Sequence, residues 1–267
     1  MSRFAEYAQA FELLRSVLAK PFRGFGLGLR LVEPGEFFGR LQGNNLTALR
    51  RALLNERPEA YCVWLAAEPE SLVRRFAEQY DVEVQKQPTR ELGAVWEPDY
   101  VVLARTEPQW VLGGCVCFPS GWSLPAKCGR SIWETHAGVP GLNGSIGAQI
   151  GRFLSSLRPN QAFQRVNLGF SSSVELDQRP ERKIPAIKPG FDPSATQVRI
   201  EWQVLTALSQ AFLLFGIRIF QLPLALTRAD PELAKALAEL VLTLPEDLSE
   251  YKRLAPARSD LAEYLRE

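Results

Sequence analysis

The sequence predicts a mainly antiparallel α+β fold. Helical patterns dominate the first part of the chain, strand patterns interrupted by one helix dominate the middle, and helical patterns return at the end. The regular strand–helix alternation of a parallel doubly wound sheet is missing. We expect one domain over residues 1–267, with a mainly helical part (1–95), a sheet-rich core (96–225) and extra C-terminal helices (226–267).

Helices are predicted first from apolar residues that recur every three or four positions. Phe4, Phe11 and Leu18 belong to such an opening helix, which Pro21 ends. Further helices are expected over 46–55 and 69–80, with the basic pairs Arg50-Arg51 and Arg74-Arg75 on solvated faces. The glycine-rich segment 24–28 does not have the G-x-G-x-x-G spacing of a phosphate-binding loop, so we interpret it as an extended segment.

Strands are predicted where β-branched and aromatic residues cluster between proline and glycine. The helix that interrupts them carries apolar residues on one stripe. The expected strands cover 100–104, 110–118, 164–170, 198–205 and 212–221; the expected later helices cover 141–157, 231–242 and 259–265; and 177–190 is expected to be a long irregular loop.

Composition and charge exclude several classes of function. The 267 residues are 46% hydrophobic and 23% charged, as in ordinary globular proteins. Lys and Arg number 31 against 30 Asp and Glu, and a net charge of +1 gives no electrostatic footprint for nucleic acid or anionic lipid. No stretch matches the about 20 apolar residues that a membrane span needs, and no signal core is visible, so we expect a cytoplasmic protein.

The segment 115–143 holds three of the four cysteines and the only histidine, His136. A single histidine excludes H-E-x-x-H zinc chemistry. Cys115, Cys117, Cys128 and His136 offer a Cys₃His zinc set, yet the C-x-C spacing is not that of a zinc knuckle, and small buried thiols are the favoured explanation.

Two further kinds of chemistry are open to His136. Ser120 or Ser123 could act as a nucleophile with His136 as base, but the G-x-S-x-G elbow is missing. His136 could instead be the axial ligand of a haem, which needs one neutral imidazole and an apolar slot. A core histidine bonded to a backbone carbonyl is the alternative.

The same segment resembles the haem-dependent oxidative N-demethylase family, alpha-subunit type. The similarity covers most of the chain from about Tyr100 onward, with several separate motifs in the same order. They are Phe118-Pro119-Ser120-Gly121-Trp122, Lys127-x-Gly129, His136-x-x-Val139-Pro140, Arg165-Val166-Asn167, Arg199-x-Glu201-x-Gln203-x-Leu205, Tyr251-Lys252 and Leu261 to Leu265. Departures from the family pattern are Thr135, Gly138, Leu168, Trp202, Val204 and Ser209, and we interpret them as clustering near the pocket.

The resemblance implies a PAS-like antiparallel sheet with helices packed on one face around haem b. It also implies oxygen-dependent removal of a methyl group from a small amine such as dimethylamine. By the same resemblance, electrons would come from separate flavin and iron–sulfur reductase partners. The cysteines here lack the C-x₄-C-x₂-C spacing of a plant-type ferredoxin cluster, so we expect that the chain does not supply its own reductase centre.

The resemblance and strand geometry together identify candidate catalytic residues. On a strand, Arg199, Glu201 and Gln203 point to the same face. A guanidinium beside a carboxylate could polarise dioxygen and hold an ammonium substrate, and Arg165 could join them or pair with a haem propionate. A cross-strand ion pair on a solvated face is the structural alternative.

Other residues are expected to contact the cofactor. Lys127, Arg130 and Trp133 are the candidates beside the metal ligand His136, while Glu175 and Asp177 are weaker alternatives for the substrate carboxylate. Besides the demethylase, a haem-based sensor without turnover and a zinc-stabilised structural domain remain open from the sequence.

Overall fold

One antiparallel sheet organises the part of the chain that the structure, a computed structural model, describes: residues 3–19, 24–40, 46–80, 82 and 89–267. In sheet order, its strands are β1 (Arg30–Val32), β5 (Ala162–Ser171), β6 (Gln197–Ala207), β7 (Phe212–Pro223), β3 (Asp99–Ala104), β4 (Val111–Cys115) and β2 (Cys62–Trp64). Every neighbouring pair is antiparallel, which confirms the predicted α+β class.

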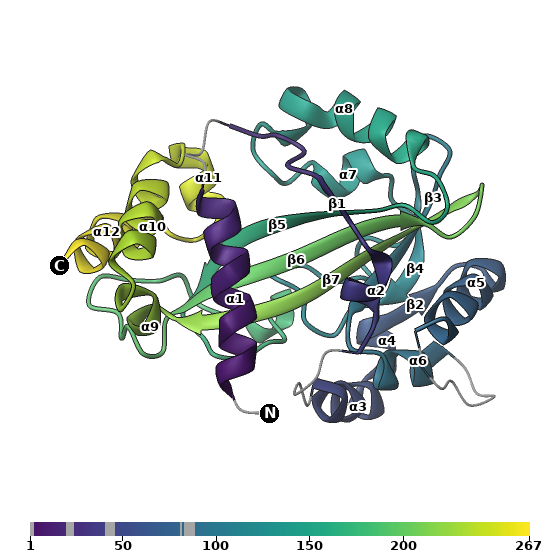
Figure 1. Cartoon of the computed structure of the whole chain (residues 1–267), viewed down its shortest axis with the longest axis horizontal. Helices are drawn as coiled ribbons and strands as arrows, with labels where there is room; N and C mark the ends of the chain where they lie inside the picture. Colours follow the sequence, from purple (N-terminus) through teal and green to yellow (C-terminus); the bar gives the residue numbers. More distant parts are fainter. Residues whose placement is uncertain (1–2, 20–23, 41–45, 81, 83–88) are drawn as a thin grey trace.

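Helices precede, interrupt and follow the strands, as predicted (Figure 1). Short 3₁₀ turns at Pro180–Arg182 and Ala255–Ala257 complete the order. The helices are α1 (Arg3–Leu18), α2 (Pro34–Phe38), α3 (Leu46–Glu56), α4 (Pro58–Tyr61), α5 (Ala67–Glu78), α6 (Thr89–Val95), α7 (Ile132–His136), α8 (Leu142–Ser156), α9 (Leu224–Arg228), α10 (Pro231–Thr243), α11 (Glu246–Tyr251) and α12 (Arg258–Arg266).

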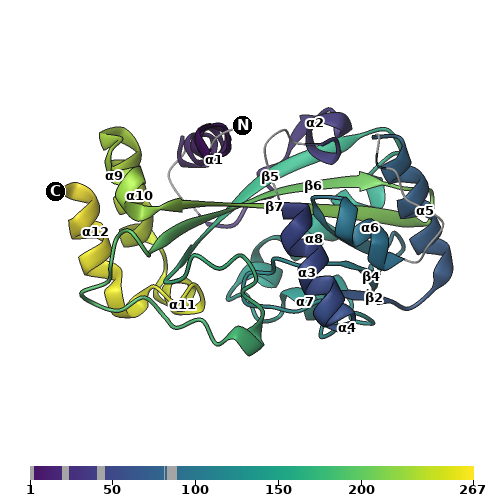
Figure 2. The same ribbon diagram turned by 90° about the horizontal axis from the view of Figure 1, so that it is seen from below.

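Helices cover both faces of the sheet, which corrects the expectation that they pack on one face. Figure 2 shows α1 and α2 above the sheet, and we call this side the upper face and the opposite side the lower face. Trp202 of β6 points to the upper face, where its ring meets Phe37 of α2 edge-on at 5.0 Å. The lower face carries Leu205 and Leu213, which share an apolar cluster with Leu154 of α8.

A glycine lets α2 lie directly on the upper face. A Cβ atom on Gly216 of β7 would lie 2.5 Å from Cε1 of Phe37, so any other residue would push the helix away. Close packing of this kind makes the centre of the sheet the core of the molecule. The main apolar cluster joins this centre to α1, α2 and the C-terminal helices.

Two basic residues lie in the core. Arg50 of α3, predicted on a solvated face, is fully buried and pairs with Asp99 at 2.6 Å. Arg218 of β7 is 4% exposed and pairs with Glu97 at 2.7 Å. Buried charges persist only when paired and hydrogen-bonded, so these two pairs hold their segments in fixed places.

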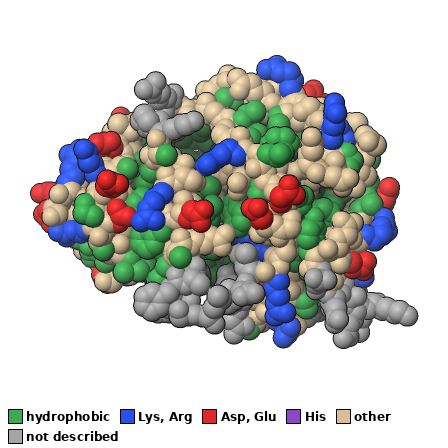
Figure 3. Space-filling model, viewed as in Figure 1, with side chains coloured by type: hydrophobic (Ala, Val, Ile, Leu, Met, Phe, Trp, Pro, Cys, Tyr) green, Lys and Arg blue, Asp and Glu red, His purple; other side chains and the backbone are tan. Residues whose placement is uncertain are grey.

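The surface agrees with the balanced composition. On the face in Figure 3, the coloured basic and acidic side chains are interspersed among apolar ones. The described helices include none with both the length and the apolar character of a membrane span.

Candidate functional site

The candidate site lies on the lower face of β5 and β6. Arg165 pairs with Gln203 across the two strands, Asn167 with Glu201, and Gly169 with Arg199. Directly paired residues point to the same face, so the register groups these polar side chains. The motif Arg199-x-Glu201-x-Gln203 therefore points to one face, as the sequence predicted.

Glu201 is the centre of a buried hydrogen-bond network. Its side chain is 9% exposed. One carboxylate oxygen accepts from Ser120 Oγ at 2.6 Å, and the other accepts from Asn167 Nδ2 at 3.0 Å and from Gln203 Nε2 at 2.7 Å. These three neutral donors fix the orientation of the carboxylate, and they replace the cross-strand ion pair on a solvated face that was the structural alternative.

Arg199 holds two loops against the sheet. Its Nε donates to Ser120 Oγ at 2.7 Å, and its Nη2 donates to the carbonyl oxygens of Phe118 at 2.8 Å and Leu176 at 2.9 Å. The side chain is 2% exposed. Burial lowers the pKa of Arg199 to about 10, against the opposing effect of nearby carboxylates led by Glu201, so the guanidinium is charged at neutral pH.

The two loops also pair with each other. The backbone N–H of Gly121 donates to the carbonyl of Gln178 at 2.9 Å, and the N–H of Gln178 donates to Pro119 at 3.1 Å. The loop around Gln178 is fixed further by Asp177, which accepts from Tyr61 Oη at 2.9 Å. Asp177 is thus bound by protein groups, and it is 5% exposed.

Two more cations lie near Glu201. Burial lowers the pKa of Arg165, and the charge of Glu201 opposes this shift. Among the described residues, no hydrogen-bond acceptor reaches the buried Nε of Arg165. Burial also lowers the pKa of Lys252, whose Nζ donates to the carbonyl of Leu168 at 2.6 Å. The Nε–H of Arg165, which has no acceptor among the described residues, is suited to bind an anionic group of a ligand.

His136 ends the short helix α7. The helix begins with a capping box in which Ser131 and Glu134 bond each other's backbone N–H groups. The imidazole is half-buried, and no hydrogen bond joins it to another described residue. Burial lowers the pKa of His136 to about 4, helped by the charges of Arg165 and Lys127, so the imidazole is neutral at neutral pH.

The three residues predicted to contact the cofactor lie in different environments. Lys127 lies beside α7, where its Nζ donates to the carbonyl of Thr135 at 3.0 Å. Arg130 is exposed. The indole of Trp133 lies against α8, since a Cβ atom on Gly147 would come within 2.0 Å of it. Of the two basic candidates, Lys127 is the one whose charge helps to lower the pKa of His136.

The other chemistries considered for this segment find no support in the geometry. Cys115 and Cys117 belong to the main core, and Cys128 packs against the α8 cluster. Within the described residues, no three His, Cys, Asp or Glu side chains form a group that could hold a metal ion. Ser120 binds Arg199 and Glu201 instead of the imidazole of His136.

Three departures from the family motifs do not face the site. Leu168, Trp202 and Val204 point to the upper face, and all three belong to the main core. Trp202 donates from Nε1 to Gln164 at 2.7 Å. The expectation that the departures cluster near the pocket is therefore wrong for these three positions.

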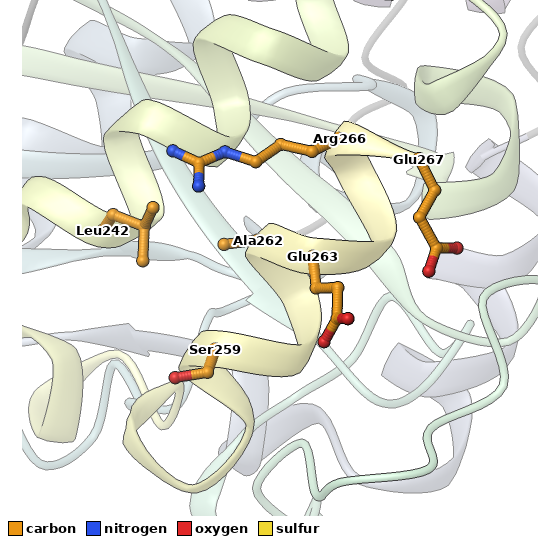
Figure 4. Close-up of a pocket in the computed structure, with 6 residues that line it drawn as sticks. All are labelled: Leu242, Ser259, Ala262, Glu263, Arg266 and Glu267. Atoms are coloured by element: carbon orange, nitrogen blue, oxygen red, sulfur yellow. The ribbon is translucent and has the colours of Figure 1, made fainter.

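Two depressions in the described surface lie elsewhere. One is bordered by residues of the loop 185–191. Figure 4 shows another, at the C-terminal helix α12, where the side chain of Arg266 extends toward Leu242. Its lining consists of Leu242, Ser259, Ala262, Glu263, Arg266 and Glu267.

The lower-face residues fit a haem better than a metal ion held by protein alone. Haem iron needs one protein ligand, and the neutral imidazole of His136 qualifies. Its carboxylate groups need cations, and Arg165 carries an unmatched buried Nε. Half-buried Trp122 and Val139 supply apolar surface in the same segment.

Sequence reasoning missed several members of the network. Asn167 and Lys252 stand in the motifs without an assigned role, and the alternation along the strand groups Gln203 with Glu201 without predicting their hydrogen bond. The burial of Arg50 is not predicted, because a basic pair on a helix is typical of a solvated face. A lone Asp99 before an apolar strand was the available signal for a buried carboxylate.

Comparison with protein families gives a match to this chain. The model of the family described as haem-dependent oxidative N-demethylase, alpha subunit-like, matches residues 45–262, which include every motif quoted above except the last few positions. The name supports a haem cofactor and oxidoreductase function of the oxidative N-demethylase kind, and it makes further subunits plausible. The chain belongs to the haem-dependent oxidative N-demethylase, alpha-subunit-like family.

Proposed function

We propose that this protein binds haem b through His136 and removes a methyl group oxidatively from a small amine such as dimethylamine. The observation that carries the proposal is the grouping on the lower face. The positive charge of Arg165 helps to lower the pKa of His136, and the negative charge of Glu201 acts to raise the pKa of Arg165. A neutral imidazole, a guanidinium whose Nε has no hydrogen-bond partner among the described residues, and a carboxylate thus lie in one region.

His136 would hold the haem iron, and Arg165 and Lys127 would neutralise the haem propionates. Haem would supply the dioxygen-dependent redox chemistry of the oxidation. The low pKa of His136 keeps one of its two ring nitrogens free of a proton at neutral pH, as an iron ligand requires.

Glu201 would hold the ammonium group of the substrate. Its carboxylate is buried and oriented by three neutral donors, so its charge is not cancelled by a direct ion pair within the described residues. A negative group in a site of low dielectric attracts a small cation strongly.

The roles predicted for Arg199, Arg130 and Trp133 change in this proposal. Arg199 is a positioning residue, because protein oxygens occupy its Nε and Nη2 donors. Arg130 is exposed and Trp133 packs on α8, so neither is assigned to the cofactor.

The reaction needs partners. Removing one methyl group consumes one dioxygen, two protons and two electrons, and it yields formaldehyde, water and the demethylated amine. We propose that a separate flavin and iron–sulfur reductase delivers the electrons. We further propose that the chain acts in the cytoplasm and forms one domain with a PAS-like sheet. The continuous hydrogen bonding from β1 to β2 supports the single domain.

The test is reconstitution with haemin, followed by dimethylamine, dioxygen and a chemical reductant. We expect formaldehyde to be released, and Glu201→Gln to weaken amine binding about tenfold or more, since it removes the charge and keeps the shape. Glu175→Gln, at an exposed site, is the matched control and should behave like wild type. A haem-loaded protein that releases no formaldehyde from any small amine would favour the gas-sensor function instead.

A further inference from the structure

The loop that carries Ser120 is held from behind by a buried ion pair. Asp99, the first residue of β3, is 1% exposed. Its Oδ1 accepts from the backbone N–H of Cys117 at 2.7 Å, and its Oδ2 accepts from the N–H of Phe118 at 2.8 Å. These two amides begin the segment that leads to Ser120.

Arg50 completes the support. Its Nη1 donates to Asp99 Oδ1 at 2.6 Å, and its Nε donates to the carbonyl of Gly93 at 2.6 Å. The guanidinium also lies 5.5 Å from the ring centroid of Phe118, over its face. Helix α3 is thereby connected through one carboxylate to the loop that reaches Glu201.

We propose that Asp99 and Arg50 are positioning residues of the amine site. They hold the amides of Cys117 and Phe118, and so place Ser120 where its hydroxyl can orient the Glu201 carboxylate. The assignment of the amine to Glu201 rests on the proposed function, whereas the placing of the loop does not.

A second ion pair in the same core provides a matched control. Arg218 and Glu97 are as deeply buried, and their nitrogen and oxygen lie 2.7 Å apart. The other donors of Arg218 go to the carbonyls of Phe37 and Gly39, next to α2 on the upper face. Glu97 is two residues from Asp99, and its backbone carbonyl accepts from Arg50 Nη1 at 3.3 Å, but its carboxylate binds Arg218 instead of the loop that carries Ser120. Glu97→Gln therefore breaks a buried ion pair in the same core without removing an acceptor of the Cys117 and Phe118 amides.

The variants Asp99→Asn and Glu97→Gln separate positioning from general destabilisation. In Asp99→Asn, three donors converge on a group that keeps only one acceptor oxygen, so at least one backbone amide loses its partner. We expect both variants to be less stable than wild type in urea, because each leaves a buried guanidinium without its charge partner.

Two measurements report on the site itself. Hydrogen–deuterium exchange of a peptide covering 116–122 should become about tenfold faster in Asp99→Asn and stay unchanged in Glu97→Gln. The dissociation constant of dimethylamine, from spectral titration of the haem-loaded protein, should rise about tenfold in Asp99→Asn alone. Should Asp99→Asn fail to fold, Arg50→Lys, which keeps the charge but not the planar fork, should show the same pattern in smaller measure.

Unchanged exchange and unchanged amine affinity in Asp99→Asn would overturn the proposal, as would equal changes in Glu97→Gln. A wild-type protein whose spectrum does not respond to any small amine contradicts the proposed function alone. In that case the exchange of 116–122 in the two variants still decides whether Asp99 places the loop.

Discussion

The two ends of the lower face of the sheet have opposite chemistry. Under α8, Leu205 and Leu213 meet an apolar helix stripe and are covered by simple packing. A few residues along β6, Arg199 and Glu201 are buried among hydrogen-bonding groups. Packing at the first end gives stability at little cost, whereas burying charge at the second is expensive unless each group is bound. This cost is one reason for proposing that the functional site lies at the polar end.

Arg199→Met should break the polar end most severely. The change leaves the carbonyl groups of Phe118 and Leu176 and the hydroxyl of Ser120 without their buried donor, at a cost of about 3–5 kcal/mol in the free energy of unfolding. Urea unfolding measures this loss. Arg130→Met, at an exposed position, is the control and should change stability by less than about 0.5 kcal/mol. An equally small effect for Arg199→Met would show that the two loops do not depend on it.

Leu213→Ala should destabilise the apolar end without touching function. Leu213 is fully buried in the α8 cluster. Truncating it leaves a cavity that costs about 2–5 kcal/mol. Thermal or urea unfolding should record the loss, while haem affinity and amine affinity of the folded protein stay at wild-type values. A change in amine affinity as large as that of Glu201→Gln would mean that the two ends are not independent.

The smallest expected effect is a difference in the alkylation rates of two cysteines, Cys128 and Cys117. Burial raises the pKa of Cys128 to about 11 and that of Cys117 well above its usual value. Because only the thiolate reacts, native-state alkylation at pH 8 should be slow at both sites and faster as the pH rises toward 11. Cys128 should react before Cys117, since it is half-buried and Cys117 is fully buried. Mass spectrometry of the alkylated peptides checks the order of labelling. Rapid labelling of Cys117 at pH 8 would contradict its burial in the core.

The long elements could be predicted from the sequence, and the short ones could not. The predicted strand 212–221 and helix 231–242 correspond to β7 and α10. An element of about ten residues contains enough repeats of its apolar pattern for the periodicity to be recognised. The edge strands β1 and β2 have three residues each, and their pairing is decided by the strands beside them. They were not predicted for that reason.

The candidate site could be predicted in part. Alternation along β6 was enough to group Arg199, Glu201 and Gln203, since a strand fixes which side chains share a face. The bonding of Ser120 depends on a loop that crosses back over the sheet, and the burial of Arg50 depends on Asp99, 49 positions further along the chain. Such contacts arise from tertiary packing, which no local pattern contains.

The proposal that this protein holds haem through its single imidazole has one direct test. Tag-free protein carries only one histidine, so any imidazole-ligated spectrum must come from His136. Titrating haemin into wild-type protein and into His136→Ala, and following the Soret band, should show tight, imidazole-type binding in the first and affinity at least about a hundredfold weaker in the second. An unchanged Soret band and unchanged affinity in His136→Ala would contradict the assignment.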